Sequence, residues 1–158
     1  IEQIMQGDLD DQVRDALRST GLDARRLELD LDEQVLKEDD KRIVDTVRAL
    51  HAGGVRLAID DFGRGLSSVP RLKRYPVKAL KLDPALVREV GSSEEHEAIV
   101  EAITCMAAPL GLQVFARGVE DEAQQAFLSA LDCHLQQGAL FGPPMTAAAF
   151  ATYLRDRG

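Results

Sequence analysis

Two adjacent carboxylates, Asp60 and Asp61, are the residues best placed to do chemistry, because they follow an apolar strand and precede a glycine-rich turn. The aliphatic side chains before them share one face of that strand: Val55, Leu57 and Ile59. The period of two expected for a strand therefore directs Asp60 toward the opposite face. Gly63 and Gly65 give the backbone freedom to turn, so Asp61 is expected to point back toward Asp60.

Neighbouring carboxylates repel each other unless a cation lies between them. A divalent metal such as Mg²⁺ or Mn²⁺ is the expected cation, since both ions prefer oxygen ligands. The alternative is that Asp60 and Asp61 are solvated loop residues that cap a following helix. This stretch alone favours neither interpretation.

Charged and polar side chains recur near the carboxyl ends of the other strand-like runs. They are Asp30 in the run 27–32, Lys81 in 77–83, Arg117 in 112–118 and Gln137 in 133–138. The alternation within each run places them on or beyond the face opposite the aliphatic residues. We therefore expect these side chains to converge with Asp60 at one edge of a sheet.

The elements that must position these residues alternate between helix and strand. Helices are expected over 8–20, from Asp39 or Asp40 to Gly53, over 69–74, from a cap at Ser92 to Met106, over 123–131 and from Thr146 onward, and strands over 27–32, 55–60, 77–83, 112–118 and 133–138. Ser92 is chosen because Glu95 follows three residues later, the spacing of a capping box. Such alternation is typical of parallel strands joined by right-handed crossovers.

The fold class predicted from this order is α/β, and more specifically a (β/α)8 barrel. A barrel collects its site residues from the carboxyl ends of many strands, as the pattern here requires. An open doubly wound sheet is the alternative, but no phosphate-binding glycine-rich turn opens a helix after the first strand. A closed barrel needs about three further strands before Ile1. Residues 1–158 are thus expected to form a single domain that lacks its amino-terminal strands.

The composition suits one domain with an aliphatic core: 158 residues, 45% hydrophobic and 4% aromatic. The net charge of −8 argues against broad nucleic-acid binding, because an acidic protein does not profit from displacing phosphate counterions. No apolar run approaches the roughly eighteen residues of a membrane helix, so no membrane contact is expected. Cys105 and Cys133 lie in apolar runs, which predicts core thiols and a reducing, cytoplasmic setting.

Other ionisable residues have plainer interpretations. His51, His96 and His134 show no metal-ligand spacing and are interpreted as surface or helix residues. The basic residues of one further cluster are interpreted as a solvated face: Arg71, Lys73, Arg74 and Lys78.

Five motifs recur in order along the chain: Leu27-Glu-Leu-Asp-Leu-Asp-Glu33, Ala58-Ile-Asp-Asp-Phe-Gly63, Leu80-Lys-Leu-Asp83, Ala116-Arg-Gly-Val-Glu120 and Gln137-Gly-Ala-Leu-Phe141. Together they resemble the EAL domains, the cyclic di-GMP phosphodiesterases of bacteria. The likeness covers nearly the whole chain, with the motifs in the family's order and spacing. The Glu-Ala-Leu motif that names the family, and an Asn ligand on a later strand, would both lie before Ile1.

The resemblance implies a metal-dependent hydrolysis of cyclic di-GMP to linear pGpG, with two Mg²⁺ or Mn²⁺ ions holding the attacking water. Asp60 matches the carboxylate that bridges the two metals, and Asp61 matches its partner on the second metal. Lys81 matches the lysine near the water, where a fixed positive charge favours hydroxide.

Three further positions match family residues in or beside the site. Glu33 matches a glutamate that braces the Asp-Asp loop. Glu120 matches an acid in the mouth of the barrel, and Gln137 matches an amide that lines the substrate site.

Two positions depart from the family pattern. Asp30 stands where a metal-binding glutamate is usual, which shortens the ligand by about 1.5 Å. Arg117 stands where the family has a glutamate that binds the second metal and is often assigned as the base. A charge change of two units beside a dication weakens that metal, and the guanidinium is assigned to substrate binding instead. Arg64 and Leu66 also depart from the family's loop pattern.

A degenerate active site is therefore expected, and three functions stay open. The first is a cyclic di-GMP receptor that does not hydrolyse its ligand, the second an active phosphodiesterase within a full-length parent, and the third a protein-interaction scaffold. Lys81 and Arg117 would then be structural ion-pair residues in the scaffold. Further expectations are a homodimer through the Asp61 to Ser68 loop and other signalling domains in the parent chain.

Overall fold

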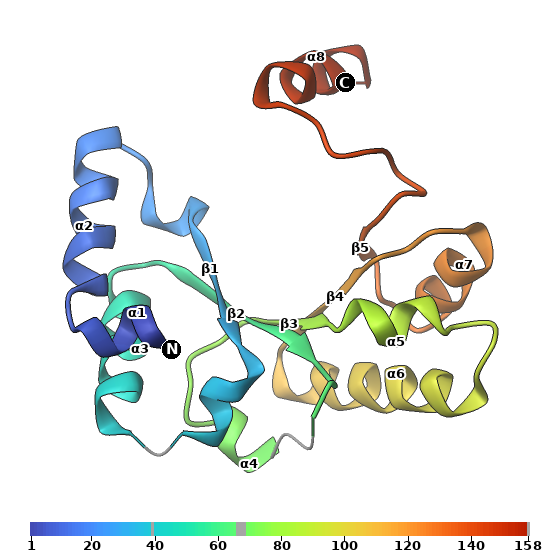
Figure 1. Cartoon of the computed structure of the whole chain (residues 1–158), viewed down its shortest axis with the longest axis horizontal. Helices are drawn as coiled ribbons and strands as arrows, with labels where there is room; N and C mark the ends of the chain where they lie inside the picture. Colours follow the sequence, from blue (N-terminus) through green and yellow to red (C-terminus); the bar gives the residue numbers. More distant parts are fainter. Residues whose placement is uncertain (39, 66–68, 158) are drawn as a thin grey trace.

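The structure, a computed structural model, describes residues 1–38, 40–65 and 69–157. Its centre is a parallel sheet in which the described strands follow chain order from β1 to β5 (Figure 1). The strand bounds are β1 Glu28–Asp32, β2 Arg56–Phe62, β3 Ala79–Leu82, β4 Gln113–Arg117 and β5 Leu135–Gln137. Sequential order without a switch point is the arrangement of a barrel wall, not of a doubly wound sheet.

Helical segments connect the strands. Their bounds are α1 Glu2–Gln6, α2 Leu9–Thr20, η1 Ala24–Arg26, η2 Glu33–Lys37, α3 Lys41–Ala52, α4 Val69–Leu72, α5 Pro84–Arg88, α6 Glu94–Ala107, η3 Ala108–Leu110, α7 Glu122–Ala130 and α8 Ala147–Arg157. Figure 1 shows α1, α2 and α3 grouped beside β1, and α5 running alongside α6. The helix α8 stands apart from the sheet at the end of a long connection after β5. None of the described helices has the length and apolar character needed to cross a membrane.

Helix starts largely follow the predicted caps. Asp40 accepts a hydrogen bond from the Arg42 N–H and so caps α3, whereas Asp39 lies outside the described residues. The cap predicted at Ser92 is wrong by one residue, because Ser93 Oγ accepts from the His96 N–H. Ser92 instead donates to the Glu89 carbonyl, since it belongs to the turn that ends α5.

The short helix α5 was not expected from the sequence. Its signal was present, because Asp83 caps it by accepting from the Ala85 N–H and Pro84 occupies the first turn. The strand-like run 77–83 ends one residue earlier than its pattern indicates, so that Asp83 serves the helix and not the strand.

The core is aliphatic, and the helices cover it with the apolar side chains of their inward faces. Cys133 is buried, as predicted, but Cys105 is exposed. The reason is helical geometry: α6 directs Val100, Ile103 and Ala107 inward, and Cys105 lies between them on the other side of the helix.

The backbone from Asp60 to Gly65, at the end of β2, is called the aspartate turn. Substitution of Gly63 tests the packing that supports it. The φ of Gly63 is +98°, and an added Cβ would lie 2.6 Å from Leu86 Cδ1 and 2.9 Å from Ile103 Cδ1. Gly91 has a similar φ of +87° but open space around it. Gly91→Ala is expected to cost only left-handed strain of about 1 kcal/mol, and Gly63→Ala about 1–3 kcal/mol more from overpacking. Urea unfolding of both variants measures the difference, and equal losses would contradict this account.

Candidate active site

The predicted site residues of the central strands do converge. Asp32 pairs in register with Asp60 across β1 and β2, and the β2–β3 register shifts between Ile59 and Phe62, where the two aspartates lie. Asp61 itself adopts a left-handed φ of +52°. The turn of Asp61 toward Asp60 therefore occurs as expected, although it uses a strained aspartate as well as Gly63.

Arg117 occupies the space between the two aspartates. Its Nη2 lies 2.8 Å from Asp60 Oδ1 and 2.5 Å from Asp61 Oδ1. Asp60 Oδ1 also accepts from the Asp61 N–H at 2.9 Å. Burial raises the pKa of Asp60, while the Asp61 N–H and Arg117 oppose that rise. The guanidinium thus supplies the positive charge that the paired carboxylates require.

Arg117 also carries a polar atom with no partner. Its Nε is buried and finds no hydrogen-bond acceptor within the part of the chain that the structure describes. A buried N–H without an acceptor costs free energy.

Lys81 is the second cation of the site, and it is held by two carboxylates of β1. Its Nζ lies 2.7 Å from Asp30 Oδ1 and 3.1 Å from Glu28 Oε1, and 5.6 Å from the centre of the Phe115 ring. Burial disfavours the charged ammonium, but the hydrogen bonds that it donates to Asp30 and Glu28 outweigh this effect, so the pKa of Lys81 is raised. Arg56 approaches the other Glu28 oxygen at 3.5 Å and extends the charge chain to β2.

These contacts decide how well the side chains fit a pair of divalent metals. Asp30 is paired with Lys81, and Asp60 and Asp61 are paired with Arg117. Across residues 1–38, 40–65 and 69–157, no cluster of three or more His, Cys, Asp or Glu residues is arranged to hold a metal ion. In this arrangement the residues do not fit the two-metal centre, because protein cations neutralise each expected ligand.

The predicted brace at Glu33 makes the contact that its role requires. The carboxylate is buried, 5% exposed, and its Oε2 accepts from the Gly65 N–H at 3.1 Å. It therefore ties η2, which follows β1, to the turn that follows β2.

Glu120 and Gln137 lie farther out. Glu120 Oε1 is 3.6 Å from Arg88 Nε, and both side chains are more than half exposed. Gln137 pairs in register with Arg117 and lines an open cavity of about 300 Å³ together with Phe141 and Met145. Their assigned roles in substrate binding stay predictions.

Sequence reasoning did not assign Glu28, Arg56 or Phe115 to the site. The signal for Glu28 was its place on the acidic face of the run 27–32, shared with Asp30. Phe115 shares its face with Arg117 by the same alternation. Alternation within a strand does not reveal which residue lies opposite on the neighbouring strand. The cross-strand register decides that, and it pairs Lys81 with Phe115.

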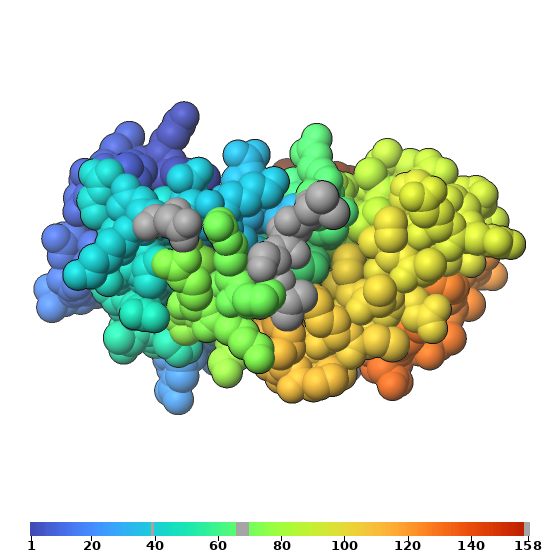
Figure 2. Space-filling model, turned by 90° about the horizontal axis from the view of Figure 1, so that it is seen from below, coloured from blue at the N-terminus to red at the C-terminus, as the bar shows by residue number. Residues whose placement is uncertain are grey.

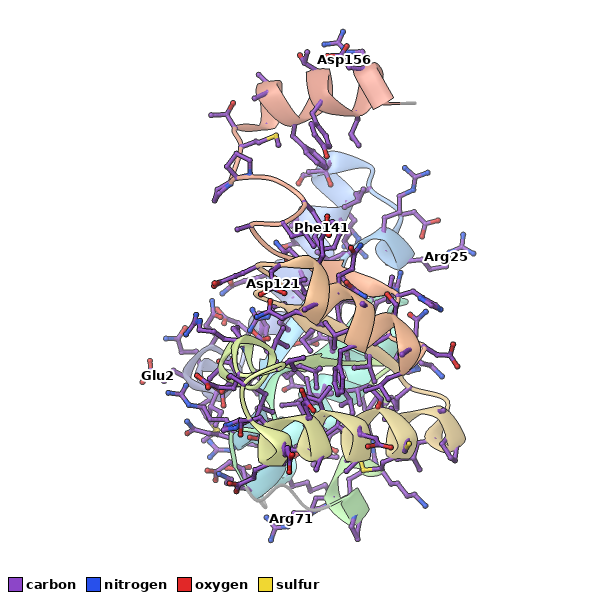
Figure 3. The ribbon with its side chains drawn as sticks, turned by 90° about the vertical axis from the view of Figure 1, so that its right-hand side faces the viewer. Glu2, Arg25, Arg71, Asp121, Phe141 and Asp156 are labelled. Carbon is purple, nitrogen blue, oxygen red and sulfur yellow. The ribbon has the colours of Figure 1, made fainter. Side chains whose placement is uncertain are left out.

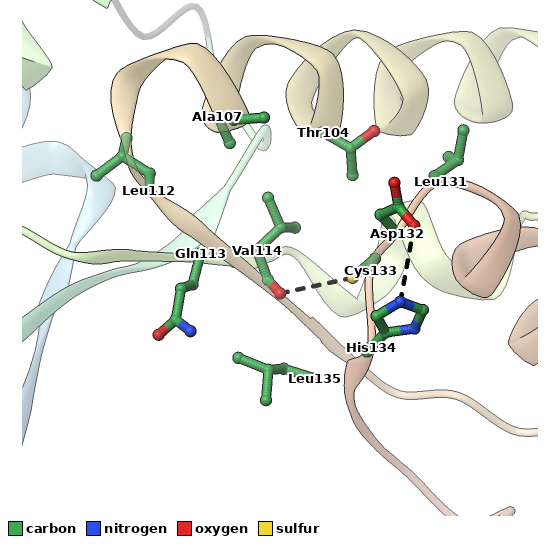
Figure 4. A pocket seen from close by; sticks show the side chains of 11 residues that line it. Thr104, Ala107, Leu112, Gln113, Val114, Leu131, Asp132, Cys133, His134 and Leu135 are labelled. Carbon is green, nitrogen blue, oxygen red and sulfur yellow. Dashed lines mark hydrogen bonds and ion pairs between the residues drawn. The ribbon is translucent and has the colours of Figure 1, made fainter.

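A second hollow, of about 330 Å³, opens at the other ends of β4 and β5 (Figure 4). Its lining is largely apolar and includes Leu112, Val114 and Leu135. Cys133 Sγ lies 3.6 Å from the Val114 carbonyl, and burial raises the pKa of the thiol to about 11. The lining also includes His134 and Asp132, whose Nε2 and Oδ1 atoms lie 3.7 Å apart.

The chain matches the family model of the EAL domain over residues 1–144. It is 41% identical over 145 residues to the cyclic di-GMP phosphodiesterase NbdA of Pseudomonas aeruginosa, which is 92% of this chain and 18% of that protein. The chain thus spans about a fifth of the length of that curated relative.

Solved structures match the fold closely. The PaMucR phosphodiesterase in complex with c-di-GMP, from Pseudomonas aeruginosa, superposes with a TM-score of 0.89 at 39% identity, over 94% of this chain and 60% of that chain. A manganese and cy-diGMP complex of Klebsiella pneumoniae BlrP1 superposes with a TM-score of 0.80 at 31% identity, over 87% and 35% of the two chains. The prediction of an EAL-type barrel, of which this chain contributes a parallel sheet, is confirmed. The chain belongs to the EAL domain family.

Proposed function

We propose that this chain is a cyclic di-GMP receptor domain of a bacterial signalling protein, which binds the dinucleotide without hydrolysing it. Similarity to proteins named as cyclic di-GMP phosphodiesterases supports the choice of ligand. The observation that carries the absence of hydrolysis is the Arg117 guanidinium between Asp60 and Asp61.

A guanidinium at this position works against metal-assisted hydrolysis in two ways. A guanidinium carries N–H donors and no acceptor, so it can neither ligate a cation nor accept a proton from water. It also repels a dication by roughly 8 kcal/mol at 4 Å and an effective dielectric of 20, before solvation and movement reduce the effect. Mg²⁺ or Mn²⁺ is therefore expected to bind weakly here.

The same guanidinium suits a phosphodiester. One nitrogen, Nη2, contacts both aspartates, while Nε has no acceptor among the described residues. Arg binds phosphate in bidentate fashion through adjacent nitrogens. A phosphate oxygen that displaces one aspartate from Nη2 would give the Nε an acceptor at the same time. Lys81 would add positive charge nearby, with Gln137 and Glu120 at the rim contacting the rest of the ligand.

An active phosphodiesterase is the second candidate. The observation in its favour is that Asp30, Asp60, Asp61 and Lys81 all converge, while a relative of known structure carries manganese with the same dinucleotide. The third candidate is a scaffold with no nucleotide. A homodimer through the Asp61 to Ser68 loop stays a prediction, and residues 66–68 of that loop lie outside the described residues.

Titration calorimetry with cyclic di-GMP tests the receptor. The chain is expected to bind equally well in EDTA and in Mn²⁺, because protein cations contact the phosphate. Arg117→Ala should weaken binding about tenfold or more, the value of a charge-assisted hydrogen bond. Arg25→Ala, at an exposed position in η1, is the matched control and should bind normally. Absence of any binding heat from the unaltered chain would favour the scaffold.

Arg117→Glu tests the reason for weak metal binding. A third carboxylate beside Asp60 and Asp61 is expected to raise Mn²⁺ affinity at least tenfold, measured by electron paramagnetic resonance of free Mn²⁺. Arg117→Gln removes the positive charge without adding a ligand and should give a smaller gain. The unaltered chain should release no pGpG from cyclic di-GMP in Mn²⁺, and product above a buffer control would establish the active enzyme instead.

The raised pKa of Asp60 predicts a pH-dependent difference in stability. A carboxyl group whose folded pKa exceeds its unfolded value destabilises the fold once both states are ionised, and that cost disappears as pH falls below the unfolded pKa. Asp60→Asn keeps the oxygen that accepts from Asp61 N–H and should be more stable than the unaltered chain at pH 7. The advantage should vanish below about pH 3.8, the unshifted value. Urea unfolding at a series of pH values measures this, and an advantage that grows in acid would refute the assignment.

A further inference from the structure

The aspartate turn needs support from outside itself. Asp61 holds a left-handed φ of +52°, which a residue other than glycine adopts only where its surroundings enforce it. The turn continues to Gly65, whose N–H donates to Glu33 Oε2. The support therefore reaches the turn through the short helix η2, which carries Glu33.

The helix η2 cannot supply this rigidity alone. It is a 3₁₀ segment of five residues, Glu33–Lys37, and 3₁₀ segments have poorer hydrogen bonds than α-helices. The carbonyls in its last turn lack partners within the helix. Val35 and Leu36 are nearly fully buried. The Val35 carbonyl accepts from the Glu38 N–H at 3.3 Å, and the carbonyls after it are bound by a donor from elsewhere in the protein.

Those donors come from the segment around α4. Tyr75 Oη donates to the Val35 carbonyl at 3.0 Å, and Arg71 Nη1 donates to the carbonyls of Leu36 at 3.3 Å and Lys37 at 2.6 Å. Two side chains thereby donate to three successive carbonyls of η2, of which the Val35 carbonyl also accepts from the Glu38 N–H. Figure 2 shows the green segment of α4 lying directly beside the cyan segment that includes η2. A cation at the carboxyl end of a helix is also favoured by the helix dipole.

Little free space separates η2 from the aspartate turn. A Cβ built on Gly65 would lie 3.3 Å from Glu33 Oε2 and 3.1 Å from Lys37 Nζ, so η2 contacts the turn at both of its ends. A displacement of η2 would be transmitted to Gly65 and hence toward Asp61, because interiors at this packing density transmit strain.

We infer that Arg71 and Tyr75 are positioning residues for the aspartate turn: they fix η2, and η2 presents Glu33 to the Gly65 N–H. The sequence context of Arg71 indicated a solvated basic face. In the structure its guanidinium instead donates to two carbonyls of η2. The consequence for ligand affinity rests on the proposed receptor function, whereas the mechanical link does not depend on any ligand.

Tyr75→Phe tests the link most cleanly, because it removes one hydroxyl and keeps the buried ring. Amide hydrogen exchange at Gly65, measured by NMR on the whole chain, is expected to become about two- to ten-fold faster, the factor that corresponds to losing one hydrogen bond. Arg71→Met, which keeps the aliphatic stem, should act in the same direction. Tyr153→Phe is the matched control, since Tyr153 lies in α8 and donates to the Phe141 carbonyl. Figure 3 shows α8 at the end of the molecule opposite Arg71, so Gly65 exchange should not change.

Three outcomes decide the inference. Faster exchange at Gly65 in Tyr75→Phe, without a matching rise at Val100 in the core of α6, supports it. Unchanged exchange at Gly65 overturns it, as does an equal rise throughout the core, which would mark a purely structural role. Affinity for cyclic di-GMP should fall by a factor similar to the change in exchange. If the unaltered chain binds no dinucleotide, the proposed function fails, while exchange at Gly65 still decides the positioning role.

Discussion

The repulsion between Asp60 and Asp61 is the constraint on which this site depends. Adjacent carboxylates at the end of a buried strand are unfavourable unless a positive charge reaches both. Arg117 meets this need with one nitrogen, because β4 ends at the same edge of the sheet as β2. The left-handed backbone at Asp61 completes the arrangement, since it turns the second carboxylate toward the guanidinium.

Other carboxylates on the polar face of the sheet are also paired with basic side chains of the protein. Lys81 reaches back across the sheet to Asp30 and Glu28, and Arg56 closes the chain of charges. Either a metal ion or a basic side chain can offset the repulsion between neighbouring carboxylates, but the two differ in the reactions that they support. A divalent ion activates water, whereas a guanidinium or an ammonium fixes an anion in place. In this chain the cations that contact the carboxylates are Arg117 and Lys81.

The positions of these charges are set by packing some distance away. Glu33 links the aspartate turn to η2, and Arg71 and Tyr75 link η2 to the segment around α4. Each link joins connections that follow different strands of the sheet. The geometry of the site thus depends on two successive crossovers, as is usual where a barrel assembles its mouth from successive loops.

The sequence alone determined the features that depend on local periodicity. Alternation assigned Asp60, Lys81 and Arg117 to the polar face of their strands, and the order of elements predicted a parallel barrel-type sheet. Local pattern failed where two neighbours compete for one role, as at Ser92 and Ser93, or where an apolar run does not say which side of a helix a residue takes, as at Cys105.

Only the tertiary structure decided which charges meet. The bond from Arg117 to Asp61 spans 56 positions of sequence, that from Lys81 to Asp30 spans 51, and that from Tyr75 to Val35 spans 40. Strand register and the packing of separate crossovers set those encounters, and neither leaves a mark in the local pattern of residues. The sequence therefore determined which groups line the face of the sheet, and the three-dimensional packing determined that Asp30, Asp60 and Asp61 are each bound by a cation of the protein itself.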